Sequence, residues 1–184
     1  MAETSLERAW RSTRAVAANV RPEQFALPTP CQSWNVQNLL NHMIGVSYFY
    51  VSGATTGKAE LSDRDYTEGD FLATYDEGIR QAVAVIPQCM ERDVTLPFGT
   101  IPGAMWTGIV TTDAFIHGWD LAAATGQPTD LDPELAAELL EGARLFLQPE
   151  FRGDDTVAPF GPEQDAPPGA TNAAQLAAFL GRRV

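Results

Sequence analysis

The chain has 184 residues but few cysteines and few basic side chains, and both shortages narrow the choice of function. Two cysteines, Cys31 and Cys89, do not make the disulfide framework of a small secreted protein, so we expect free thiols. Lysine and arginine together number 12 against 24 aspartates and glutamates, which gives a formal net charge of -12. Because nucleic acids and anionic membranes are bound through Lys and Arg, we expect neither as a partner.

Long apolar runs are missing as well. No segment approaches the roughly 18 uninterrupted apolar residues that a transmembrane helix needs, and the acidic Glu3 and Glu7 are unlike the basic start of a signal peptide. We therefore expect a cytoplasmic protein. With 45% hydrophobic residues, the chain is long enough for one core, which predicts a single domain over residues 1–184.

Apolar residues recur at helical spacing along most of the chain, and no series of strands is visible. The predicted helices cover residues 4–21, 36–52, 67–86, 104–124, 132–147 and 171–181. Residues 92–103 are typical of a turn-rich loop that holds at most a short strand pair, and residues 149–170 of a surface tail. These elements predict an all-α fold: an antiparallel four-helix bundle with an additional C-terminal helix and an extended Pro/Gly-rich tail.

Capping residues and helix breakers set the predicted boundaries. Thr4 or Ser5 would cap the first helix and Asn35 the second, because their side chains can accept from free backbone N–H groups. The third helix is expected to end near Pro87, and Gly126 should end the fourth.

The fourth predicted helix is apolar on both sides. At 100 degrees per residue, one arc contains Trp106, Ile109, Val110, Asp113, Ile116, His117, Asp120 and Leu121. Phe115 and Trp119 lie on the opposite side, so this helix should be central. Gly118 lowers helix propensity and hints at the close approach of another backbone or a ligand.

The same helix carries a candidate metal site. The chain has only two histidines, and Asp113 stands four residues before His117, so that both side chains share one helical face. Carboxylates on an apolar arc carry a desolvation cost unless they are paired, capped or bound to a cation. We expect Asp113 and His117 to meet His42 of the second helix around a divalent metal, as ligands do in bundle cores.

Alternatives remain at this point. A buried histidine is often a core residue with satisfied hydrogen bonds, and the pattern D-x-x-x-H is short enough to arise by chance. Asp120, one turn beyond His117, could orient an imidazole, form a local cap, or act as a catalytic base. Cys31 could be a thiol activated near a helix start or an inert one.

Two longer stretches resemble a known family. They are Thr29-Pro30-Cys31-Gln32-Ser33-Trp34-Asn35-Val36-Gln37-Asn38-Leu39-Leu40-Asn41-His42 and Asp113-Ala114-Phe115-Ile116-His117-Gly118-Trp119-Asp120-Leu121-Ala122. Both resemble metal-binding proteins of the DinB-like superfamily from actinobacteria, in the branch related to the N-terminal domain of mycothiol-dependent maleylpyruvate isomerase. Two tail motifs fit the same branch: Phe160-Gly161-Pro162-Glu163 and Phe179-Leu180-Gly181-Arg182.

The resemblance implies a four-helix bundle that holds a divalent metal through His42, Asp113 and His117. The isomerase has Glu where this chain has Asp113, so the geometry of the site is expected to differ by about one methylene. Zn²⁺ is the first expectation for the metal, and Ni²⁺, Fe²⁺ or Mn²⁺ also suit these ligands. Mycothiol is the cosubstrate that the resemblance implies.

The expected function is therefore that of a metal-dependent enzyme that uses a thiol for S-transfer or isomerisation of a small electrophilic molecule. Trp106, Phe98 and Tyr48 are the candidates for an apolar substrate wall, and Asp120 is the candidate catalytic residue. A metal-dependent hydrolase, a cyclase or isomerase without a thiol, and a non-catalytic small-molecule binding module stay open. Self-association as a homodimer is also left open.

Overall fold

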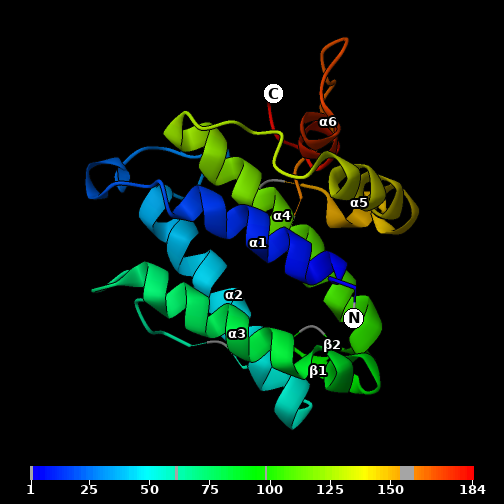
Figure 1. The fold of residues 1–184 in the computed structure, drawn as a ribbon. Coiled ribbons are helices and arrows are strands. Elements are labelled where there is room, and N and C mark those ends of the chain that lie inside the picture. Colours follow the sequence, from blue (N-terminus) through cyan, green and yellow to red (C-terminus); the bar gives the residue numbers. More distant parts are fainter. Residues whose placement is uncertain (1, 61, 98, 154–159) are drawn as a thin grey trace.

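The computed structural model describes residues 2–60, 62–97, 99–153 and 160–184, and most of them are helical. Six α-helices are present in this described part: α1 (Ser5–Ala17), α2 (Val36–Thr56), α3 (Phe71–Met90), α4 (Gly103–Thr125), α5 (Pro133–Phe146) and α6 (Asn172–Phe179). Helices α1 to α4 pack against one another, and α5 and α6 pair with each other at one side (Figure 1). The predicted helical fold class is confirmed. No helix in the described ranges has the length and apolar character needed to cross a membrane.

The beginnings of the first two helices agree with the prediction. Thr4 accepts from the backbone N–H of Glu7 at 3.2 Å, and Glu7 accepts from the Thr4 N–H at 2.7 Å, which completes a capping box. Asn35 caps α2 by accepting from the Asn38 N–H at 2.9 Å. The Asn35 cap fixes where α2 begins, and therefore the position of His42 along that helix.

Several predicted helix boundaries were wrong. Helix α1 stops at Ala17, earlier than expected, and α2 continues past residue 52 to Thr56. Helix α3 begins at Phe71 rather than at residue 67, and it runs through Pro87 to Met90. Proline in the last turn removes one backbone hydrogen bond. The packing of Ile86 and Cys89, which are buried, offsets that loss because it anchors the final turn to the core.

The loop between α3 and α4 contains a two-stranded hairpin, in agreement with the expected short strand pair. Strand β1 (Asp93–Leu96) pairs antiparallel with β2 (Gly99–Pro102), with Val94 opposite Ile101. Val94 is fully buried, so the hairpin closes one end of the core. Short 3-10 turns lie at Pro22–Gln24 and Pro149–Phe151.

Helix α4 occupies the centre, as its two apolar faces predicted. It contacts α1, α2, α3, α6 and both strands. Phe115 and Trp119 are buried on one side, while Ile116 and Leu121 are buried on the other. The second half of α4 is enclosed most completely, which brings the polar side chains of His117 and Asp120 into the interior, while Asp113 stays partly exposed.

Gly118 lies where α1 crosses α4. A Cβ atom at this position would overlap the side chain of Thr13 on α1, so the expected close approach is confirmed. Gly108, in the same helix, has open space around it.

We predict that Gly118→Ala destabilises the protein by about 1–3 kcal/mol, although alanine favours helix, because the methyl group forces α1 and α4 apart. Gly108→Ala is the matched control and should stabilise by about 0.5–1 kcal/mol. Urea unfolding of both variants measures the difference. Equal stabilisation by the two substitutions would show that α1 and α4 do not pack as described.

Candidate metal centre

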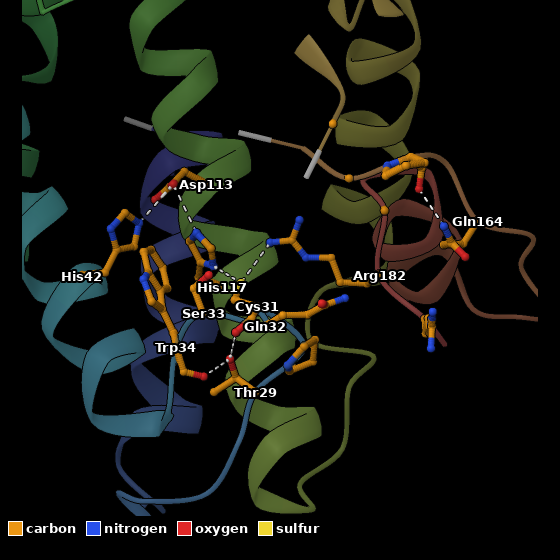
Figure 2. A pocket seen from close by; sticks show the side chains of 16 residues that line it. Thr29, Cys31, Gln32, Ser33, Trp34, His42, Asp113, His117, Gln164 and Arg182 are labelled. Carbon is orange, nitrogen blue, oxygen red and sulfur yellow. Dashed lines mark hydrogen bonds and ion pairs between the residues drawn. The ribbon is translucent and has the colours of Figure 1, made fainter. Parts of the chain in front are cut away.

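Three side chains from two helices converge at the predicted site. Nε2 of His42, on α2, lies 3.2 Å from Oδ1 of Asp113 on α4, and Nε2 of His117 lies 3.4 Å from the same oxygen. One possible ligand atom from each of the three residues lies within 4.8 Å of the ligand atoms of the other two. The imidazoles stand edge to face with ring centroids 4.7 Å apart, and their inner nitrogens point toward Asp113 (Figure 2).

The donor set fits a divalent metal. Two imidazole nitrogens and one carboxylate are ligands that Zn²⁺ and related ions accept, with positions left for other ligands. Oδ2 of Asp113 is buried and has no hydrogen-bond partner among the described residues, which is costly for a carboxylate unless a cation satisfies it. No fourth acidic, histidine or cysteine donor joins this group in the described part of the chain.

Two clefts meet at His42 and Asp113, and both are also lined by Ser33 and Trp34, whereas His117 lines only the first of them. One cleft, of about 1020 Å³, also contains Arg182 and Arg183, and we call it the arginine cleft. The other, of about 860 Å³, has further aromatic walls, and we call it the aromatic cleft; its aromatic residues are Trp34, Tyr48, Phe49, Tyr66 and Trp106. The side chains of His42 and Asp113 remain 29% and 28% exposed, so a small molecule can reach them.

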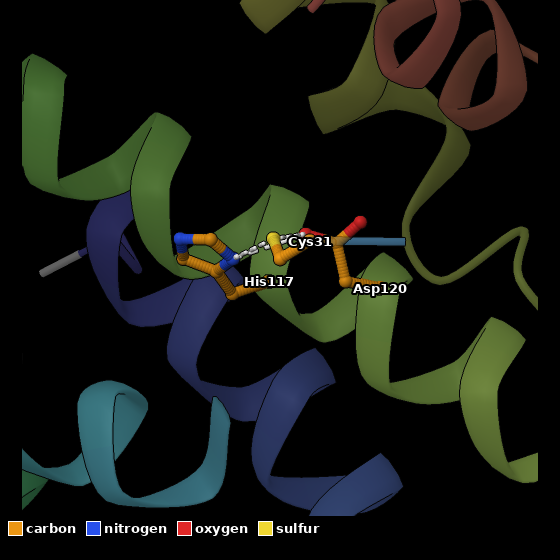
Figure 3. Close-up of side chains that lie close together, drawn as sticks. All are labelled: Cys31, His117 and Asp120. Carbon is orange, nitrogen blue, oxygen red and sulfur yellow. Dashed lines mark hydrogen bonds and ion pairs between the residues drawn. The ribbon is translucent and has the colours of Figure 1, made fainter. Parts of the chain in front are cut away.

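The other nitrogen of His117 contacts a second carboxylate. Nδ1 lies 3.0 Å from Oδ2 of Asp120, one turn further along α4 (Figure 3). With Asp120 ionised, Nδ1–H donates to it and Nε2 keeps its lone pair for a metal. Asp120 is completely buried. Its position favours the predicted role of orienting an imidazole over that of a base that contacts substrate.

Arg182 neutralises Asp120. Its Nη2 donates to Oδ2 at 2.9 Å and its Nε donates to Oδ1 at 3.2 Å, so the contact is bidentate. The Cys31 thiol donates to Asp120 Oδ2 at 3.2 Å, and Arg182 Nη2 lies 3.4 Å from the sulfur. Both cysteines are free thiols, as expected.

The turn that ends α6 directs the Arg182 side chain toward Asp120 and Cys31. Gly181 follows the helix with a φ of 96°, and the Arg182 N–H donates to the Ala177 carbonyl at 2.9 Å, as in a Schellman motif. The backbone of Gly161 lies against Gly181, where a Cβ atom would come within 2.6 Å of the Gly161 Cα. The two tail motifs therefore meet, and their glycines allow the approach that brings Arg182 inward.

A second candidate donor group shares His117. Cys31, His117 and Asp120 also place one donor each within 4.8 Å of one another. In that group, however, the Arg182 guanidinium already occupies both oxygens of Asp120. A cation beside this guanidinium would meet a like charge, so the geometry favours the group of His42, Asp113 and His117.

The carboxylates and the cationic side chains of this site stabilise each other's charged forms. Burial would raise the pKa of Asp113, but His42 and His117 lower it below its usual range. Burial opposes protonation of His117, yet Asp113 and Asp120 raise its pKa well above the ordinary value. For Asp120, the Arg182 charge and His117 outweigh burial and lower the pKa. Without a metal, the network is held as carboxylates around an imidazolium.

The structure places the remaining predicted residues as follows. Tyr48 and Trp106 line the aromatic cleft, although Trp106 is only 2% exposed and mainly packs against Tyr50 and Phe49. Phe98 lies outside the described residues. Sequence reasoning did not connect Arg182 to Asp120, and it did not place Trp34, whose ring centroid lies 4.7 Å from that of His42.

Comparisons with known proteins give a family. The family described as the mycothiol maleylpyruvate isomerase N-terminal domain matches residues 6–122, which include all three proposed ligands and Asp120. Two uncharacterized proteins of Mycobacterium tuberculosis, from strains CDC 1551 and H37Rv, are each 39% identical to the chain over 178 residues. Each alignment covers 97% of this chain and 96% of the relative.

We predict that Arg182→Met destabilises the protein by about 3–5 kcal/mol, because Asp120 would stay buried without its counter-charge. Arg183→Met, at the exposed neighbour, should change the free energy of unfolding by no more than about 0.5 kcal/mol. The double variant Asp120→Asn with Arg182→Met should recover part of the loss, since no buried charge remains. Chemical denaturation measures all three, and equal stability of the two single variants would contradict the buried pair.

We also predict that Zn²⁺ binding at pH 7 releases about one proton. His117 has a raised pKa and is protonated in the metal-free protein, whereas a ligand imidazole is neutral; Asp113, whose pKa is lowered, is already ionised and releases none. Affinity should therefore rise with pH until the free His117 has lost its proton. Calorimetry in two buffers of different ionisation enthalpy counts the protons, and identical heats in both would refute this protonation state.

Proposed function

The chain belongs to the family of the mycothiol maleylpyruvate isomerase N-terminal domain, a DinB-like family, and we propose that it is a divalent-metal-dependent enzyme. Its reaction would use a small thiol, with mycothiol as the cosubstrate that the family suggests. The thiol would serve S-transfer or isomerisation of a small electrophilic molecule.

One observation carries this proposal: two imidazoles and a carboxylate converge where two clefts reach them. Such a set leaves coordination positions for a ligand from solution, as catalytic sites do and structural sites do not. Nε2 of His42, the Asp113 carboxylate and Nε2 of His117 would hold the ion, and Zn²⁺ is our first choice. When bound, Zn²⁺ would lower the pKa of a thiol that contacts it, and the thiolate is the nucleophilic form.

Residues of the chain supply the remaining functions. Asp120 accepts from Nδ1 of His117 and so fixes the orientation of that ring. Trp34 lies beside both imidazoles, with centroid distances of 4.7 Å to His42 and 5.5 Å to His117, and it would form an apolar wall next to them. The Arg182 guanidinium keeps Asp120 ionised although Asp120 is buried.

The aromatic cleft is the proposed site for the electrophile. Tyr48 and Tyr66 stack with centroids 5.2 Å apart on one wall, and the edge of Trp106 forms another. Aromatic faces bind flat, apolar groups well, because such groups lose their hydration without leaving polar atoms unsatisfied.

We extend the proposal to the whole chain. Helices α1 to α4 would form the DinB-like four-helix bundle, and α5, α6 and residues 149–170 would be additions to it. Residues 1–184 would be one cytoplasmic domain that acts on small molecules, with nucleic acid and membranes excluded by its net charge of -12.

The test begins with metal content. Zn²⁺ should bind with near 1:1 stoichiometry, and His42→Ala or Asp113→Ala should each lose it, because one donor of three is removed. Asp113→Glu should retain metal, since the carboxylate stays. Asp63→Ala is the control, as this exposed carboxylate lies outside both candidate donor groups. Elemental analysis of protein purified without an affinity tag for metals measures each.

Activity is tested next with the Zn²⁺-loaded protein, N-acetylcysteine and a panel of small α,β-unsaturated carbonyl compounds. We expect thiol-dependent loss of the carbonyl compound that disappears in His42→Ala. Hydrolysis without thiol would instead support a metal-dependent hydrolase. Tight metal binding with neither reaction would support a non-catalytic binding module.

A further inference from the structure

The aromatic cleft contains a side-chain amide directly beside a metal ligand. Asn41 precedes His42 on α2, and both residues line this cleft together with Gly45, one helical turn later. Oδ1 of Asn41 accepts from the backbone N–H of Tyr66 at 2.6 Å. This contact shows which end of the amide is the oxygen, and it fixes the orientation of the whole group.

The amino group of Asn41 is left for a ligand. Nδ2 donates to no described residue, and Asn41 is partly exposed and lines the cleft. The hydroxyl of Tyr48, by contrast, is used within the protein, because it donates to the Thr74 carbonyl at 3.0 Å. Asn38 also lines the cleft, but it is exposed, so water already satisfies its amide. Asn41 is therefore a preorganised N–H donor at a partly enclosed position.

The ring of Tyr66 lies against α2 close to this amide. A Cβ atom at Gly45 would come within 3.3 Å of the Tyr66 ring, so the glycine permits the ring to approach the helix. Tyr66 in turn stacks on Tyr48 with an angle of 10° between the ring planes. A flat, conjugated carbonyl compound suits this arrangement, because its apolar part can contact aromatic side chains while its oxygen accepts from an N–H group.

The described lining of the aromatic cleft has no lysine or arginine. The two basic residues on either side of Glu60 in the sequence are engaged within the protein. Lys58 pairs with Glu60 at 3.1 Å, and the guanidinium of Arg64 lies over the Tyr66 ring at 5.2 Å from its centroid. Negative charge that develops on a ligand oxygen in this cleft therefore has to be stabilised by N–H donors such as Asn41 or by the metal.

We propose that Nδ2 of Asn41 donates a hydrogen bond to the carbonyl oxygen of the electrophile, which would be an α,β-unsaturated ketone or aldehyde with a flat apolar part. This inference rests on the proposed function, and it adds a catalytic residue and a substrate class to it. Asn41 would bind the oxygen of the electrophile while the neighbouring His42 holds the metal.

The donor would act on a defined step. The thiolate sulfur forms a bond to the β-carbon, the C=C electron pair moves to the bond between the α-carbon and the carbonyl carbon, and the oxygen takes the negative charge of an enolate. The proton that the thiol gave up then returns, through water, to the α-carbon. In an isomerisation, rotation about the bond between the α- and β-carbons and departure of the thiolate restore the C=C bond instead. A hydrogen bond to the enolate is charge-assisted and stronger than one to the ketone, so it lowers the barrier.

The binding experiment uses the full chain loaded with Zn²⁺ and two ligands of similar shape, 2-acetylnaphthalene and 2-ethylnaphthalene, of which only the first has a carbonyl oxygen. Asn41→Asp keeps an oxygen for the Tyr66 N–H but removes the amide donor. It should weaken 2-acetylnaphthalene by about fivefold to tenfold and change the affinity for 2-ethylnaphthalene by no more than about twofold. Equilibrium dialysis measures both affinities.

Asn38→Asp is the matched control, because it makes the same chemical change in the same cleft at an exposed amide, and it should change either affinity by no more than about twofold. The infrared carbonyl stretch of bound 2-acetylnaphthalene is a second readout. Its frequency should be lower in the wild type than in Asn41→Asp, since the hydrogen bond weakens the C=O bond. Equal frequencies in both proteins, which direct coordination of the ketone to the metal would produce, would overturn the role of Asn41. Equal weakening of the ketone by both substitutions would do the same.

The rate of thiol addition separates this inference from the proposed function. With N-acetylcysteine and 4-phenyl-3-buten-2-one, Asn41→Asp should lower kcat/KM by about 100-fold while the metal content stays near 1:1. An unchanged kcat/KM in this variant would overturn the inference and leave the proposed function intact. Absence of thiol addition in the wild type would overturn the proposed function, and the catalytic role of Asn41 with it.

Discussion

The imidazole of His117 lies between two carboxylates of its own helix, and the rest of the site depends on that contact. Nε2 faces Asp113 at 3.4 Å and Nδ1 faces Asp120 at 3.0 Å. Asp120 is completely buried and Asp113 is only partly exposed, so neither carboxylate is hydrated as it would be at the surface. Each needs a counter-charge, and the two solutions differ: Arg182 serves Asp120, while a metal with His42 would serve Asp113.

This difference explains why the C-terminal segment packs beside the central helix α4. Asp120 is balanced by a residue 62 positions away, and that contact requires α6 to end beside α4 with the glycines of both tail motifs in contact. Asp113 keeps one buried oxygen without a hydrogen-bond partner among the described residues, while its side chain as a whole stays 28% exposed and lines both clefts. The fold thus satisfies both oxygens of Asp120 with hydrogen bonds and leaves Asp113 able to bind a cation.

Features that depend on neighbouring residues in the sequence could be predicted from the sequence alone. The spacing of Asp113 and His117 predicted a shared face, and the cap at Asn35 placed His42 on a neighbouring helix. The extension of α3 past Pro87 was missed because core packing of the last turn outweighed a missing hydrogen bond. The partnership of Asp120 with Arg182 was missed because it joins distant segments. Two signals pointed to it: a carboxylate on an apolar face, which requires a partner, and a Gly181-Arg182 pair directly after a helix.

The central claim is that His42, Asp113 and His117 hold a divalent metal with positions open to the clefts. The most direct measurement is anomalous X-ray scattering at the zinc absorption edge from crystals of the Zn²⁺-loaded protein. If these residues hold the ion, one strong peak should lie about 2.0–2.2 Å from Nε2 of both histidines and from an oxygen of Asp113, with Arg182 still paired to Asp120. A peak between Cys31, Nδ1 of His117 and Asp120, with Arg182 displaced, would contradict it, as would a loaded crystal without a peak at α4.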